Sequence, residues 1–145
     1  MSQMDPWLRL GIEEATLKQT LGTPNPDVLS YEVHSNGQPI GMIALRNNWL
    51  YGPYIRFLIV LEPMQGSNFG SQIIDWVVTR ASGNGENNIW VCASDFNTSA
   101  IRFYERNGFQ RVGALEGLVR PDESEILLRR RLDQQTTGVK PIINP

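Results

Sequence analysis

The feature that most constrains the fold is an almost unbroken apolar and aromatic run from Tyr54 to Leu61, near the middle of the chain. A run of this length without polar alternation is typical of a central strand that is covered on both faces. A turn-rich connection follows at residues 62–68, and apolar residues then recur at helical spacing over residues 69–81. The pattern predicts a strand, a turn and a helix with one apolar face, so we expect an α/β domain.

The remaining elements follow from turn signals and apolar periodicity. Asn36-Gly37 predicts a tight hairpin, because its turn requires positive φ at both positions. Pro24 and Pro26 end an N-terminal region in which we expect a helix over about residues 12–21. Further strands are expected at residues 28–34, 40–45, 89–93, 109–115 and 125–132, with another helix at residues 98–107. The expected order is α-β-β-β-α-β-α-β-β around a mixed sheet.

The length of 145 residues favours a single domain, which we expect to span residues 1–132. Residues 133–145 are polar and contain Gly138, Pro141 and Pro145, which indicates a flexible C-terminal tail. The first residues lack the basic and apolar segments of a signal peptide. No apolar run reaches the roughly 20 residues that span a bilayer. We therefore expect a cytoplasmic protein without a membrane partner.

Composition excludes several classes of function. A net charge of −2 argues against a general nucleic-acid binder, which would present a strongly basic face. One cysteine, Cys92, rules out an intrachain disulfide framework and a multi-cysteine zinc site, and we expect it to be a small buried apolar residue. One histidine, His34, excludes a His-rich metal site and most His-dependent catalytic triads. No metal is expected.

A loop of small residues separates the central strand from the helix that follows it. A helix N-terminus exposes unpaired N–H groups with a partial positive charge, so small residues there can let the backbone approach a phosphate. No lysine lies in the loop, which excludes the phosphate loop of nucleotide triphosphatases. Taken alone, the loop also fits an ordinary strand-to-helix turn. Its residues are Gln65, Gly66, Ser67, Asn68, Phe69, Gly70 and Ser71.

A second stretch, from Asn97 to Phe109, has the signals of a capped helix. Asn97 can cap its start and Gly108 can close its end in the left-handed conformation. Taken alone, the apolar residues between them, Tyr104 included, fit ordinary core packing.

Together the two stretches resemble the GNAT superfamily of acetyl-coenzyme A-dependent N-acetyltransferases. Val60 to Ser71 looks like the family's strand-end valine followed by its Gln/Arg-x-x-Gly-x-Gly/Ala loop. The resemblance is clear over about residues 28–132. Asn68 stands where the family has its first loop glycine, but asparagine tolerates the left-handed conformation, so we expect the loop geometry to survive. The residues that match the family's Asn-x-x-Ala-x-x-x-Tyr-x-x-x-Gly-Phe helix are Asn97, Ala100, Tyr104, Gly108 and Phe109.

The resemblance implies a fold and a cofactor. The fold is an α/β (α+β), mostly antiparallel mixed sheet with helices on both faces, in which the strands near residues 54–61 and 89–93 splay apart. Acetyl-coenzyme A (acetyl-CoA) would lie with its pyrophosphate on the N–H groups of residues 66–71, beside Gln65 and Asn97. Its pantetheine arm would follow the strand at residues 54–61. One backbone N–H near Ile59, Val60 or Leu61 would polarise the thioester carbonyl.

Candidate catalytic residues follow from the same resemblance. Tyr104 matches the tyrosine that faces the leaving sulfur, and we expect it to share a proton with the thiolate, because full transfer would be uphill by roughly 2 kcal/mol. Where family members place a glutamate base, this chain has Tyr54 on one strand and Cys92 on the next. The base is then water, Tyr54 as a relay, or a loop carboxylate, with Glu62 and Asp95 as candidates.

Two functions remain open from the sequence. The first is transfer of an acetyl group from acetyl-CoA to a primary amine of an unidentified small molecule or peptide. The second is a non-catalytic acyl-CoA-binding sensor or interaction module. Trp49, Tyr51 and Tyr54 line an acceptor pocket or else belong to the core and strand edges. Sheet edges in this family often pair, so a homodimer is a further expectation.

Overall fold

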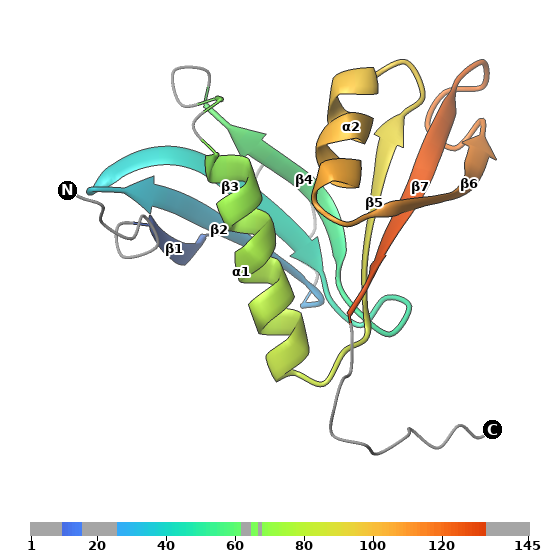
Figure 1. Cartoon of the computed structure of the whole chain (residues 1–145). Coiled ribbons are helices and arrows are strands. Elements are labelled where there is room, and N and C mark those ends of the chain that lie inside the picture. The colour runs from blue at the N-terminus through green and yellow to red at the C-terminus, as the bar shows by residue number, and fades with distance from the viewer. Residues whose placement is uncertain (1–9, 16–25, 62–64, 67, 133–145) are drawn as a thin grey trace.

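The computed structural model describes residues 10–15, 26–61, 65–66 and 68–132. One sheet of seven strands runs through the molecule in the order β1-β2-β3-β4-β5-β7-β6 (Figure 1). Every neighbouring pair is antiparallel except β4 and β5, which are parallel. The elements are β1 (Leu10–Ala15), β2 (Val28–Ser35), β3 (Gln38–Arg46), β4 (Tyr54–Val60), α1 (Phe69–Gly83), β5 (Asn88–Ser94), α2 (Thr98–Arg106), β6 (Gln110–Glu116) and β7 (Ser124–Arg131).

The parallel pair β4–β5 is joined over only two residue pairs, Tyr54 with Trp90 and Ile55 with Val91. The two strands then separate, which confirms the expected splay. A bulge lies at the same point on the other edge of β4, because Ala44 pairs with Phe57 while Leu45 pairs with Ile55. We call the place where pairing between β4 and β5 ends the fork.

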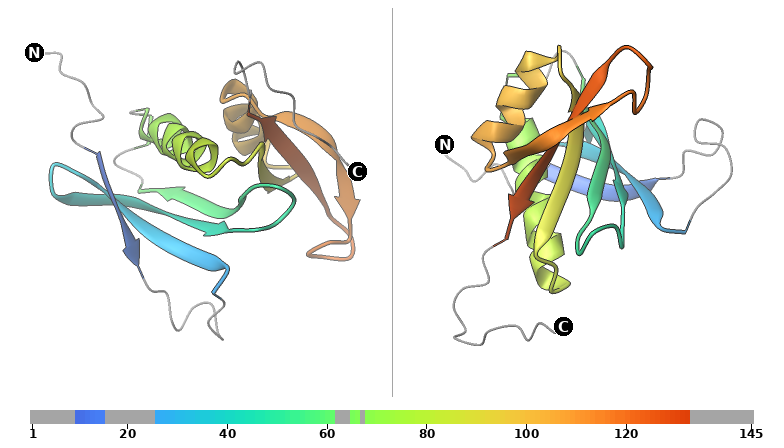
Figure 2. Two further views of the ribbon diagram at one scale, coloured as in Figure 1. Left: turned by 90° about the horizontal axis from the view of Figure 1, so that it is seen from below. Right: turned by 90° about the vertical axis from the view of Figure 1, so that its right-hand side faces the viewer.

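Both described helices cover the same face of the sheet, which we call the helix face (Figure 2). Ile73, Ile74 and Val77 of α1 are fully buried there. Strand β5 shows which residues point to which face: Ile89, Val91 and Ala93 belong to the buried core, whereas Trp90, Cys92 and Ser94 alternate with them on the opposite face. The fork therefore has two sides with different side chains.

The expected N-terminal helix is wrong where the structure describes it. Residues 10–15 form β1, which pairs with β2 from Leu10 opposite Ser35 to Ala15 opposite Ser30. Strand β2 offers an open edge, and pairing with it outweighs the modest helix preference of so short a segment. Residues 16–21 of the expected helix lie outside the described residues, as does the tail at 133–145. The expected fold has helices on both faces of the sheet, and the two described helices lie on one face.

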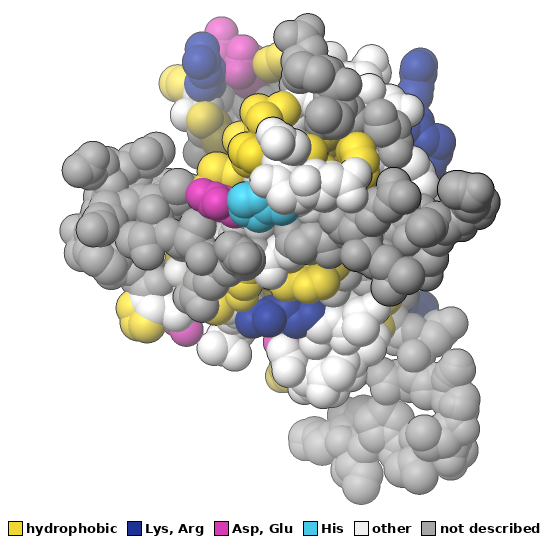
Figure 3. Space-filling view, turned by 90° about the vertical axis from the view of Figure 1, so that its left-hand side faces the viewer, with side chains coloured by type: hydrophobic (Ala, Val, Ile, Leu, Met, Phe, Trp, Pro, Cys, Tyr) yellow, Lys and Arg dark blue, Asp and Glu magenta, His cyan; other side chains and the backbone are white. Residues whose placement is uncertain are grey.

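The local turn predictions are confirmed. Asn36 and Gly37 both have positive φ, 54° and 79°, at the β2–β3 hairpin. Figure 3 shows the side of the molecule that carries this hairpin, where the histidine and an acidic side chain lie together at the surface. His34 Nε2 is 3.1 Å from Glu32 Oε1, so the histidine interacts with a neighbour on its own strand. Neither described helix is long and apolar enough to cross a membrane.

Candidate functional site

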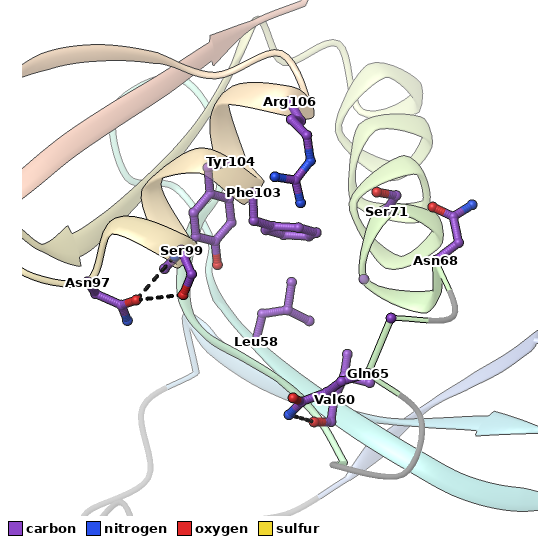
Figure 4. A pocket seen from close by; sticks show the side chains of 13 residues that line it. Leu58, Val60, Gln65, Asn68, Ser71, Asn97, Ser99, Phe103, Tyr104 and Arg106 are labelled. Carbon is purple, nitrogen blue, oxygen red and sulfur yellow. Dashed lines mark hydrogen bonds between the residues drawn. The ribbon is translucent and has the colours of Figure 1, made fainter.

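A cleft of about 560 Å³ lies on the helix face, bounded by β4, by the start of α1 and by α2 (Figure 4). Three separate stretches of sequence meet there, and two of them are the stretches singled out from the sequence. The lining residues are Leu58, Val60, Gln65, Gly66, Asn68, Gly70, Ser71, Asn97, Ser99, Ala100, Phe103, Tyr104 and Arg106.

The loop before α1 is shaped by two left-handed residues. Gly66 has φ 86° and Asn68, the N-cap of α1, has φ 67°, so asparagine does adopt the conformation expected of it. The Asn68 side chain makes no capping hydrogen bond. Since the first N–H groups of a helix have no intrahelical acceptor, those of Phe69, Gly70 and Ser71 remain available to a ligand.

Two contacts fix this loop against its neighbours. Gln65 Nε2 donates to the carbonyl oxygen of Val60 at 2.9 Å, which ties the loop to the end of β4. A Cβ at Gly70 would come within 2.9 Å of the Phe103 ring, so only glycine lets α1 and α2 approach this closely without displacement. A side chain at Gly70 would therefore displace the Phe103 ring, which lines the cleft.

Tyr104 lies where α2 approaches β4. Its ring is buried and packs edge-to-face against Phe103 and Phe109, with centroid distances of 5.1 and 5.3 Å. Its hydroxyl points into the space between α2 and β4, toward Leu58 (Figure 4). Burial raises the pKa of Tyr104 to about 12, so the hydroxyl stays protonated at neutral pH and can donate a hydrogen bond.

The cap of α2 is as expected. Asn97 Oδ1 accepts hydrogen bonds from the Ala100 N–H at 3.1 Å and from Ser99 Oγ at 3.2 Å. Asn97 thus lies in the cleft wall with its side-chain oxygen occupied by the cap, while its amide nitrogen can still donate a hydrogen bond to a ligand.

The N–H groups of β4 alternate between its two edges. Leu61 N–H donates to the Ile40 carbonyl at 2.8 Å, so this end of the strand and, by alternation, Ile59 face β3. Leu58 and Val60 then face the fork, where β5 no longer pairs. Of the three residues expected to polarise the thioester carbonyl, Ile59 and Leu61 direct their N–H groups to β3, and only Val60 directs its N–H to the fork. Leu58, which was not among the expected residues, does so as well.

On the face opposite the helices, Tyr54 and Cys92 meet beside the fork, and their side chains hydrogen-bond. Burial first, and the Cys92 thiol second, raise the pKa of Tyr54 far above its usual range. Burial likewise raises the pKa of Cys92, which is partly rather than fully buried. Both groups are protonated at neutral pH, so Tyr54 is no base by itself.

An aromatic wall continues this face. The Trp49 ring lies 5.0 Å from that of Tyr54 and 5.5 Å from that of Trp90. Trp90 Nε1 donates to the Leu50 carbonyl at 2.9 Å, which anchors the loop of residues 47–53 on β5. Tyr51, by contrast, is 83% exposed and joins no ring cluster among the described residues.

The structure brings most of the expected site residues together. Glu62 and Ser67 lie outside the described residues, and Asp95 is exposed in the loop after β5. Phe69 packs against the core, and Ile59 and Leu61 are half exposed. Ser99, Phe103 and Arg106 of α2 also line the cleft but were not among the expected site residues. They follow one another at i, i+4 and i+7, so helical spacing from Ser99 could have grouped them on one face. The residues that do share the cleft are Val60, Gln65, Gly66, Asn68, Gly70, Ser71, Asn97 and Tyr104.

Residues 2–109 match the model of the Acetyltransferase (GNAT) family. The chain belongs to this family. Among curated proteins, it is 32% identical over 83 residues to the aminoalkylphosphonate N-acetyltransferase of Salmonella typhimurium (strain LT2), a match that covers 52% of this chain and 53% of that protein. The chain thus matches about half the length of this relative.

Two solved structures share the fold. The ribosomal-protein-S18-alanine N-acetyltransferase of Escherichia coli has a TM-score of 0.73 at 13% identity, covering 90% of this chain and 99% of its own. A GNAT family acetyltransferase from Elizabethkingia anophelis with acetyl-CoA bound has a TM-score of 0.70 at 18% identity, covering 86% and 99%. At these identities the likeness concerns the architecture, which agrees with the splayed sheet described above.

Proposed function

We propose that this protein is an N-acetyltransferase that moves an acetyl group from acetyl-CoA to a primary amine. One observation carries the proposal. A single cleft connects the uncapped N-terminus of α1 to the Tyr104 hydroxyl and to the fork in the sheet. Such a cleft can hold an anionic phosphate group at one end and a reacting thioester at the other.

The residues present fit acetyl-CoA. The N–H groups of residues 68–71 and the open space at Gly66, where a Cβ would meet nothing within 4 Å, suit a pyrophosphate. Leu58 and Val60 offer apolar side chains and unpaired backbone groups to the pantetheine arm. When bound, acetyl-CoA supplies the acetyl group as an activated thioester. The neighbour from Elizabethkingia anophelis has acetyl-CoA bound, which supports the same ligand here.

Tyr104 acts on the leaving sulfur as a hydrogen-bond donor. Its pKa of about 12 lies well above that of a thiol, about 8.5, so complete proton transfer would be uphill by roughly 5 kcal/mol. A hydrogen bond from the Tyr104 hydroxyl stabilises the departing thiolate while the proton stays on the tyrosine. The N–H of Leu58 or Val60 polarises the carbonyl, and confinement in the cleft contributes by holding both reactants together.

The acceptor is a primary amine of a class still to be identified. Proteins similar in sequence or fold carry names that specify an aminoalkylphosphonate, spermidine or an alanine of a ribosomal protein as acceptor. These acceptors have only the amine in common, which is why the proposal stops at that group.

Calorimetric titration with acetyl-CoA, CoA and ATP tests the proposal, followed by a thiol-release assay with a panel of amines. We expect both CoA forms to bind, ATP to be silent, and at least one amine to release thiol. Binding without turnover over the whole panel would favour the acyl-CoA sensor instead. Failure to bind either CoA form would overturn both functions.

A further inference from the structure

One carboxylate on the face opposite the helices stands out by its surroundings. Glu125, in β7, is half-buried, and its Oε2 accepts a hydrogen bond from Ser94 Oγ of β5 at 2.8 Å. Leu115 of β6 lies directly opposite it on the other side. Among the described residues, no Lys, Arg or His forms an ion pair with Glu125. A half-buried carboxylate without a cation is a place where a positively charged group would bind favourably.

Strand register places this carboxylate beside the fork. Ser94 pairs with Glu125 and Cys92 pairs with Leu127, so Glu125 shares a face with Ser94 and Cys92. Tyr54 lies on the same face and hydrogen-bonds Cys92. Ser94 is two residues beyond Cys92, about 7 Å along the strand. The negative charge of Glu125 raises the pKa of both Tyr54 and Cys92, which agrees with this proximity.

We propose that Glu125 is the acceptor site of the enzyme: its carboxylate binds the protonated amine and removes the proton before transfer. The inference rests on the proposed acetyltransferase function and adds the residue that recognises the acceptor. The acceptor class it names is a primary alkylamine that is positively charged in solution, with an apolar or aromatic neighbour that contacts Leu115.

The two sides of the fork divide the chemistry. Acetyl-CoA lies on the helix face and the amine approaches from the opposite face. The ammonium ion passes one proton to the Glu125 carboxylate, and the free amine attacks the thioester carbon. The C–N bond forms and the C–S bond breaks. The second proton lost from nitrogen goes to the thiolate, stabilised meanwhile by Tyr104, and the proton on Glu125 leaves to solvent.

The two candidate bases that the structure describes, Tyr54 and Asp95, fit this role less well. Tyr54 is protonated and has no negative charge with which to attract an ammonium ion. Asp95 is exposed, and among the described residues no hydrogen bond fixes the orientation of its carboxylate. Glu125 alone among these combines partial burial, a fixed orientation and a position on the acceptor side.

A matched pair of acceptors tests the inference. Phenethylamine is charged at neutral pH, whereas O-benzylhydroxylamine, with oxygen in place of the CH2 next to nitrogen, has the same shape and is uncharged. For Glu125→Gln we expect kcat/KM with phenethylamine to fall about 100-fold, because both the charge partner and the base are lost. With O-benzylhydroxylamine we expect a fall of less than about 5-fold, because this amine needs no deprotonation. If phenethylamine is not accepted, the best amine of the panel and its alkoxyamine analogue replace the pair.

Controls separate this inference from the function on which it rests. Glu116→Gln removes an exposed carboxylate from the same β-hairpin and should leave both acceptors unaffected. Acetyl-CoA titration of Glu125→Gln should match that of the wild type. An active wild type whose Glu125→Gln variant loses equally on both acceptors, or loses nothing, would overturn the role of Glu125 alone. A wild type that binds acetyl-CoA but acetylates no amine would overturn the transferase function itself.

Discussion

The two faces of the sheet at the fork are built in different ways. On the helix face, the cleft uses backbone N–H groups and two short stretches, residues 65–71 and 97–106. On the opposite face, Tyr54, Cys92, Ser94 and Glu125 come from three strands and meet only through pairing and alternation. A site made of local backbone can keep one ligand over many sequences. A site made of single side chains from separate strands can change its ligand with a few substitutions.

The largest effect on the donor side of the comparison, which changes both affinity and stability, should come from filling the contact between α1 and α2. Gly70→Val would place side-chain atoms against Phe103, where even a Cβ comes within 2.9 Å of the ring. We expect acetyl-CoA affinity to fall at least 10-fold and the free energy of unfolding to fall by about 1–3 kcal/mol. Calorimetric titration and urea unfolding measure the two effects.

Gly83→Val provides the matched control, because a Cβ at Gly83 meets nothing within 4 Å. It should change neither the affinity nor the unfolding free energy by much. Phe103→Leu in the Gly70→Val background should recover part of the affinity. Unchanged affinity in Gly70→Val alone would show that the close approach of the helices does not shape the donor site.

Tyr104→Phe should lower kcat without weakening the binding of acetyl-CoA. Removing a hydrogen bond to a charged leaving group costs about 2 kcal/mol, which is roughly a 10- to 100-fold fall in kcat. Acetyl-CoA affinity should stay within about 2-fold, because the ring packing is kept. Steady-state kinetics and titration give both numbers.

Tyr51→Phe, which removes a hydroxyl from a largely exposed ring, serves as the control for Tyr104→Phe. If Tyr104→Phe has the wild-type kcat, Tyr104 is a core residue and takes no part in the reaction. A loss that appears only in acetyl-CoA affinity would instead assign it to binding.

Much of the fold could be predicted from local signals. The Asn36-Gly37 turn, the Asn97 cap and the strand from Tyr54 all lie where the sequence placed them, because each depends on neighbouring residues. The segment at residues 10–15 became a strand because β2 had an unpaired edge, which no local pattern reveals. Arg129 and Arg130 donate hydrogen bonds to Asn88 Oδ1 and to the Asn107 carbonyl, contacts that depend on strand order and that no local pattern predicts.

The site divides along the same line. The loop at residues 65–71 and Tyr104 were singled out because their two stretches together resemble the motifs of the GNAT family, and they belong to the face built from contiguous sequence. Glu125 was not found, because its partner Ser94 is 31 positions away and meets it only through β5–β7 pairing. Tyr54, expected as a relay alongside water and the loop carboxylates, lies on the face opposite the helices, where its hydroxyl is already hydrogen-bonded to Cys92.

Alkaline unfolding compares the buried tyrosines of the two faces. The pKa of Tyr104 is about 12 in the folded state and about 10 when unfolded, so its stabilising contribution is complete below pH 10 and is lost as the pH rises toward 12. At pH 11 the loss should be about 1 kcal/mol, and Tyr104→Phe should flatten that part of the curve. Tyr54→Phe should flatten it too, since burial raises that pKa as well. Urea unfolding at pH 9, 10 and 11 measures the slopes, and equal slopes in all three chains would contradict the burial of both hydroxyls.

The smallest expected effect concerns the outer end of the donor cleft. Arg106 is exposed but lines the cleft on α2, where it can meet a phosphate of CoA distant from the thioester, whereas Arg102 on the same helix lies outside the lining. Exposed ion pairs are weak and screened by salt, so Arg106→Ala should reduce CoA affinity only about 2- to 5-fold, and less at high salt. Dephospho-CoA, which lacks the 3′-phosphate, should bind wild type and variant alike, and Arg102→Ala should change neither ligand. An equal loss with both ligands would move Arg106 from the 3′-phosphate to the pyrophosphate. In either case Arg106→Ala should leave the KM for the amine unchanged, because the proposed amine site lies on the other side of the sheet.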